Sequence, residues 1–90
     1  MLEKLLPAND GKHKFIAFFT NGRKVKFGAE GYSDYTIHKD KERRERYRDR
    51  HSKDLATRDP YKPGYLSYYI LWGDSTSLDK NVKKYNEMFF

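Results

Sequence analysis

The chain has 90 residues, with 19 Lys and Arg against 13 Asp and Glu, so its formal net charge at pH 7 is +6. These 90 residues have room for one hydrophobic core and not for a second. The lack of cysteine excludes disulfides, thiolate metal sites and a cysteine nucleophile. No apolar run approaches the roughly 20 residues that span a bilayer, so we expect neither membrane insertion nor secretion.

Aromatic side chains dominate the apolar composition, because 8 Tyr, 6 Phe and 1 Trp make up 17% of the chain. Disordered segments are poor in large rings, so this composition indicates a folded domain whose core is built from rings. No repeat, low-complexity tract or linker divides it. We therefore expect one α+β domain over residues 1–90, with an N-terminal β-hairpin packed on about three short helices.

Residues 12–27 predict the β-hairpin, after an N-terminal segment over residues 1–11. Asn21-Gly22 stands between two β-prone runs, and this dipeptide is typical of a type I′ turn with two loop residues. Such a loop places four apolar side chains on the core face, in the pairs Phe18–Val25 and Ile16–Phe27.

The opposite face of this hairpin would then carry Phe15 and Phe19, open to a partner. No acid occurs between Gly11 and Ala29, whereas five basic residues do: Lys12, Lys14, Arg23, Lys24 and Lys26. An acid-free strand pair with two open rings favours a surface that binds an acidic protein or a phosphate chain.

The stretch FGAEGYSDYT follows over residues 27–36. Its glycines favour a strand-to-helix corner, because glycine reaches backbone conformations closed to other residues. A phosphate-binding nest is the less favoured alternative, since the spacing matches no nucleotide-binding loop. We expect Tyr32 and Tyr35 to close the hairpin against the helices.

Three helices are predicted, over residues 41–52, 63–72 and 77–89. Asp40 is a suitable N-cap for the first helix, and Pro63 suits the first position of the second, which is apolar nearly all round. Thr76 and Asp79 resemble a capping box before the third helix. Its apolar face is predicted to consist of Leu78, Val82, Tyr85 and Phe89.

The helix over residues 41–52 holds five arginines in eight positions: Arg43, Arg44, Arg46, Arg48 and Arg50. Guanidinium groups bind phosphate or carboxylate through two hydrogen bonds, so this helix is a candidate partner-binding surface together with the basic hairpin. The alternative is a solvated face on which pairs such as Glu42–Arg46 neutralise the charge. The sequence leaves both interpretations open.

No pattern predicts catalysis, a metal ion or a cofactor. The three histidines, His13, His38 and His51, stand at no ligand spacing, and no carboxylate pair or nucleophile with its base falls in a recognised arrangement. We therefore expect a protein that is not an enzyme and takes no small-molecule substrate.

Three segments are distinctive together: FGAEGYSDYT, ERRERYRDRH and GYLSYYILW. Through them, about residues 15–85 resemble a small uncharacterised protein family of large DNA viruses of algae and amoebae. The resemblance implies a viral origin and, by analogy, a minor capsid component that sits beneath or between the major capsid units. It assigns no functional residues.

Two functions fit these observations. The first is a structural interaction protein, a minor capsid or capsid-associated component of a virion, which docks on acidic surfaces of larger capsid proteins through basic and aromatic residues. The alternative is a basic nucleic-acid-binding accessory protein in viral genome packaging or transcription. Both place the protein in the virion or in the host cytoplasm.

Overall fold

The computed structural model describes all residues from 1 to 90 and confirms the α+β class. A three-stranded antiparallel sheet, in the order β1-β2-β3, is formed by β1 (Leu2–Pro7), β2 (His13–Phe19) and β3 (Lys24–Ala29). The helical part follows: α1 (Tyr35–His38), α2 (Lys41–His51), the 3₁₀ turn η1 (Ser52–Thr57), α3 (Pro63–Leu66), the π-helical turn η2 (Ser67–Leu71) and α4 (Leu78–Phe89).

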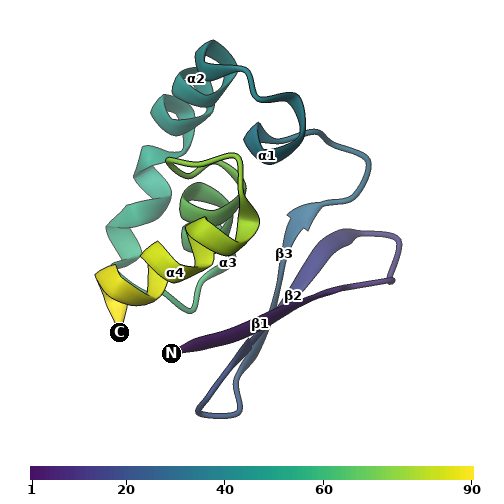
Figure 1. Cartoon of the computed structure of the whole chain (residues 1–90), viewed down its shortest axis with the longest axis vertical. Helices are drawn as coiled ribbons and strands as arrows, with labels where there is room; N and C mark the ends of the chain where they lie inside the picture. Colours follow the sequence, from purple (N-terminus) through teal and green to yellow (C-terminus); the bar gives the residue numbers. More distant parts are fainter.

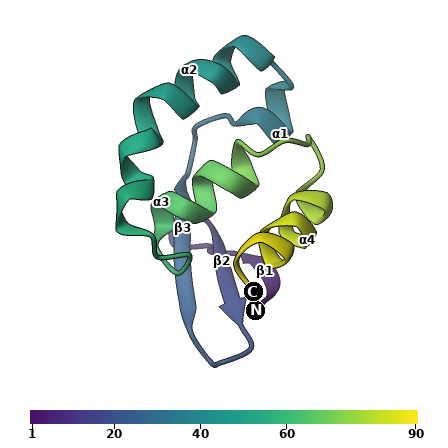
Figure 2. The ribbon, with the colours of Figure 1, turned by 90° about the vertical axis from the view of Figure 1, so that its left-hand side faces the viewer.

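The helices lie on one side of the sheet, and Figure 2 shows α3 crossing in front of β3 with α2 above it (Figures 1 and 2). The core lies between these two layers, and six of its 11 buried residues are aromatic. This confirms the expected core of rings. The most enclosed side chains include Phe27 from the sheet and Leu66, Ile70 and Tyr85 from the helices.

The N-terminal segment forms a strand, β1, that the sequence pattern did not predict. It pairs with β2 from Leu2, opposite Phe19, to Pro7, opposite Phe15. At its start, the Asn86 side chain accepts from the Leu2 N–H (2.7 Å) and donates to the Leu2 carbonyl (2.8 Å). Because Asn86 is 84 residues away in the chain, the local sequence carries no signal for this contact. It brings the two termini side by side (Figure 1).

The predicted hairpin is present, but its predicted turn and register are wrong. Gly22 has a φ of +89°, whereas Asn21 is not among the residues with positive φ. The Phe19 N–H donates to the Arg23 carbonyl (2.9 Å) and the Gly22 N–H donates to the Phe19 carbonyl (3.0 Å). The loop therefore has three residues and ends on a left-handed glycine, which shifts the register by one residue.

This shift exchanges the two faces of β2, because side chains alternate along a strand. Phe15 lies opposite Phe27, and Ala17 lies opposite Val25. Phe19 is only 3% exposed, and the half-buried Phe15 ring packs on the Phe27 ring at 5.9 Å between centroids. The prediction that Phe15 and Phe19 are open to a partner is therefore wrong.

The three predicted helices are present with altered boundaries. The Asp40 carboxylate accepts from the backbone N–H groups of Glu42 and Arg43, which confirms it as the N-cap of α2. α2 ends at His51, one residue earlier than predicted, and continues as η1. The helix predicted over residues 63–72 divides into α3 and η2, where the Trp72 N–H donates to the Ser67 carbonyl (3.0 Å).

Two helix starts also differ from the sequence prediction. Ser77, rather than Thr76, caps α4 by accepting from the Lys80 N–H, and the predicted apolar face of α4 does pack on the core. α1 is a single unpredicted turn that Asp34 caps. Its role is to place Tyr35 in the core at the end of the glycine-rich corner.

Candidate functional site

The five arginines of α2 divide into two sets with different surroundings. Arg44 and Arg48 are half-buried and hold α2 on the segment that follows η2. The Arg44 guanidinium donates to the Gly73 carbonyl (2.6 Å) and to the Asp74 carboxylate (2.7 Å). Arg48 donates to the Trp72 carbonyl (2.8 Å). Arg44 therefore uses Nε and Nη2, and Arg48 uses Nη1, within the chain. These contacts correct the prediction that both arginines face a partner.

The second set consists of Arg43, Arg46 and Arg50, all of which are exposed. Their spacing of three and four residues places them on one side of the helix. The guanidinium groups of Arg43 and Arg50 make no hydrogen bond or ion pair within the chain, and that of Arg46 reaches only Glu42, at 4.0 Å from Nη1 to Oε2. The self-paired face that the sequence allowed is thus limited to one long contact between exposed groups.

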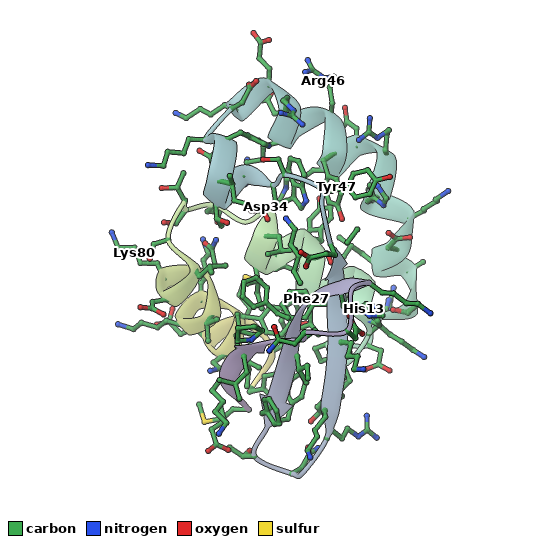
Figure 3. The ribbon with its side chains drawn as sticks, turned by 90° about the vertical axis from the view of Figure 1, so that its right-hand side faces the viewer. His13, Phe27, Asp34, Arg46, Tyr47 and Lys80 are labelled. Atoms are coloured by element: carbon green, nitrogen blue, oxygen red, sulfur yellow. The ribbon has the colours of Figure 1, made fainter.

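These three arginines line a groove of about 550 Å³, which we call the arginine groove. α2 contributes the arginines, Tyr47 and His51 to its lining. The sheet and the loop after β3 contribute residues that include Lys14, Tyr32 and Asp34. The segment from η2 to its C-terminal end contributes Ser67, Leu71 and Trp72. Figure 3 shows Tyr47 below α2 and Arg46 at the outer side of that helix. The groove therefore combines free guanidinium groups with an aromatic lining.

A stack of three rings forms part of this lining. The Tyr47 ring lies 4.2 Å from the His51 ring and 4.2 Å from the Trp72 ring, nearly parallel to the latter at 6°. The π-helical turn η2 sets the position of Trp72, and the i, i+4 spacing on α2 brings His51 to Tyr47. Burial raises the pKa of Tyr47 to about 12, so its hydroxyl stays protonated at neutral pH.

Asp34 is the only acidic residue in the groove lining, and it is already neutralised. Its side chain is 2% exposed and accepts from the Lys14 ammonium (2.5 Å) and from the Thr36 N–H (2.9 Å). A buried carboxylate of this kind needs such partners, because isolated burial of a charge is costly. The groove is therefore left with uncompensated positive charge and no free carboxylate.

The basic residues of the hairpin are dispersed rather than gathered at the groove. Only Lys14 lines it. Arg23 lies over the Tyr61 ring at 4.3 Å, Lys24 lies 5.6 Å from the Phe18 ring, and Lys26 pairs with Asp10 at 3.3 Å. The hydrogen bonds of His13 and Lys12 to Asp10 hold the pKa of that carboxyl below its usual range. Lys12 is exposed. The hairpin thus adds only Lys14 to the groove, and the Lys14 ammonium is already paired with Asp34, so the three free arginines alone remain of the predicted joint surface.

The sequence prediction missed Tyr32 as a residue of the groove. Tyr35 is buried at 6% exposure, as predicted, whereas Tyr32 is 74% exposed and does not close the hairpin. Both tyrosines lie in the glycine-rich corner, three residues apart, so their positions in the sequence do not indicate which of them is buried. Tyr47 carried a clearer signal, since it is the only large apolar residue within α2.

No group of three or more His, Cys, Asp or Glu side chains is placed to hold a metal ion. His13 pairs with Asp10 and His51 pairs with Asp54, while the His38 ring packs at 5.2 Å from the Trp72 ring. None of the helices has the length and apolar character that crossing a membrane requires.

A family model described as a family of unknown function (DUF5754) matches residues 3–51. The match runs from β1 to the end of α2, so it includes both Lys14 and the free arginines but not Trp72. No curated protein and no solved structure matches the chain.

Proposed function

We propose that this chain, which belongs to the DUF5754 family, is a structural interaction protein that binds an acidic surface of a larger protein through the arginine groove. One observation carries the proposal: three exposed guanidinium groups lack strong partners within the chain, in a groove whose only carboxylate is already paired. Guanidinium groups bind carboxylates through two parallel hydrogen bonds and tolerate burial in an interface. A partner carboxylate would satisfy donors that the fold leaves open.

The rings of the molecule favour a protein partner over a nucleic acid. Binding of single strands relies on bases stacking on open aromatic faces. Both faces of Tyr47 are covered, by His51 and by Trp72, and Phe19 is buried. Tyr32 is the one strongly exposed ring in the groove.

The partner class in this proposal is a capsid protein, and the chain is a minor capsid or capsid-associated component of a virion. The resemblance of FGAEGYSDYT, ERRERYRDRH and GYLSYYILW to proteins of large DNA viruses supports it. A docking role uses the groove for binding alone and requires no chemistry from it. Nucleic-acid binding in packaging or transcription is the competing function.

Two labelled probes test the choice: a peptide rich in Asp and Glu, and a single-stranded oligothymidine. Fluorescence anisotropy should give peptide binding that is lost in the triple variant Arg43→Glu, Arg46→Glu, Arg50→Glu. The matched control, Lys62→Glu, Lys80→Glu, Lys83→Glu, changes the same charge at exposed sites outside the groove and should keep it. Lys80 lies on α4, away from Arg46 and Tyr47 (Figure 3).

Salt dependence distinguishes the competing function. If oligothymidine binds tightly, and log K falls with log salt by about 0.7 for each neutralised phosphate, the function is nucleic-acid binding and not protein binding. In purified particles, we expect the chain in nuclease-treated shells at a fixed ratio to the major capsid protein. Its release together with the DNA would favour nucleic-acid binding, and its absence from particles would overturn the virion assignment.

A further inference from the structure

We infer that the arginine groove captures a phosphate monoester, carried by a phosphorylated side chain of the partner protein. This inference rests on the proposed function and names the chemical group that the groove selects. The three free arginines occupy consecutive turns of α2, with Arg46 between Arg43 and Arg50. At 1.5 Å per residue, the row extends over about 10 Å of helix.

The groups that line the groove suit an anion with several acceptor oxygens. Besides the arginines, the lining offers the hydroxyls of Tyr32, Ser33 and Ser67, whereas the Lys14 ammonium is already paired with Asp34. Its volume of about 550 Å³ lies in the range of ligand-binding pockets. A flat acidic surface would leave such a hollow unfilled, whereas a side chain with a terminal phosphate can enter it.

Charge distinguishes a phosphate monoester from a carboxylate in this setting. Three like charges on one side of a helix repel one another, and no acid of the groove is free to offset them. A phosphate monoester carries a charge of about −1.5 to −2 at pH 7 and three acceptor oxygens, so it can accept from more than one guanidinium group. A carboxylate has one charge and two oxygens, and it matches at most one guanidinium group fully.

The experiment compares three peptides of one sequence that differ only in a central phosphoserine, glutamate or serine. Anisotropy titrations with the full chain at pH 7.5 should show the phosphoserine peptide bound at least about tenfold tighter than the glutamate peptide. This preference should narrow at pH 5.5, because the phosphate monoester takes up a proton near pH 6. In ¹H–¹⁵N spectra, the Nε–H resonances of Arg43, Arg46 and Arg50 should shift on phosphopeptide binding, while that of Arg48 should not.

The groove variant Arg43→Gln, Arg46→Gln, Arg50→Gln should lose phosphopeptide binding, and the control Lys62→Gln, Lys80→Gln, Lys83→Gln should keep it within about twofold. Arg50→Gln alone provides the test if the triple variant does not fold, as judged by thermal melting. Equal affinity for the phosphoserine and glutamate peptides, both lost in the groove variant, would overturn this inference and leave the proposed function standing. Binding that survives in the groove variant would overturn both. Tighter binding of oligothymidine than of the phosphopeptide would overturn the inference in favour of a phosphate chain.

Discussion

Replacement of Arg48 by Met tests the division of the α2 arginines, with Arg50→Met as the matched control. Both changes remove one positive charge from the same helix and introduce a residue of similar helix propensity. Arg48 would lose its hydrogen bond to the Trp72 carbonyl (2.8 Å) and its position 4.1 Å from the Tyr68 ring centroid. Arg50 has no such contact to lose.

The magnitude follows from the two contacts of Arg48. A hydrogen bond from a charged group contributes about 1.5–3 kcal/mol. A cation–π contact adds about 0.5–1 kcal/mol at a partly exposed site. Because Arg48 is only half-buried, we expect Arg48→Met to lower the free energy of unfolding by about 2–3 kcal/mol. For a domain of this size, that corresponds to a fall in Tm of about 10–20 °C. Arg50→Met should stay within about 0.5 kcal/mol of the wild type.

Urea unfolding followed by the fluorescence of Trp72, the single tryptophan, measures both variants. The Tyr47 ring stacked on Trp72 makes this signal sensitive to the contact between α2 and η2. The slope of free energy against urea should not change, because both variants expose the same surface on unfolding. Two variants of equal stability would show that Arg48 is as solvated as Arg50, which would refute the division of the arginines.

Three further changes test the support around the groove. Asp34→Ala should lower the free energy of unfolding by about 3 kcal/mol in the same urea titration, because it leaves the Lys14 ammonium unpaired and removes the N-cap of α1. Adding Lys14→Met should restore part of this loss. A double variant that is no more stable than Asp34→Ala would contradict the lost ion pair as the cause. Burial, with a smaller effect of nearby positive charge, lowers the pKa of His38 in the folded chain. As the pH falls, His38 is therefore protonated in the unfolded chain before it is protonated in the folded chain. The free energy of unfolding should then fall as the pH drops below about 6.5. His38→Asn keeps an acceptor for the Asp40 N–H and should flatten this profile between pH 7 and 5; an unaltered profile would assign the pH dependence to other groups. Gly73→Ala should lower the free energy of unfolding by about 2 kcal/mol or more, because a Cβ at this position would collide with the Tyr69 carbonyl oxygen. If the variant keeps the melting temperature of the wild type, the turn relaxes to accommodate the Cβ.

Local signals predicted those elements whose ends depend on neighbouring residues. The Asp40 carboxylate caps α2 through N–H groups two and three residues away, and Pro63 occupies the first turn of α3. The hairpin register could not be predicted in the same way, because Asn21-Gly22 is compatible with a two-residue or a three-residue loop. Placing Phe19 and Phe27 beneath the helices favours the longer loop, and that burial depends on residues distant in the chain.

The sequence by itself determined the α+β class, the order of the hairpin and the three main helices, and the concentration of positive charge on α2. Only the tertiary structure decided which arginines stay free. α2 has no buried residue, so its period of 3.6 residues places the arginines in two rows without indicating which row meets the core. The carbonyls of Trp72 and Gly73, at the end of the π-helical turn, bind Arg48 and Arg44. That contact turns Arg43, Arg46 and Arg50 toward the groove, because residues on the other side of a helix must then face away from the contact.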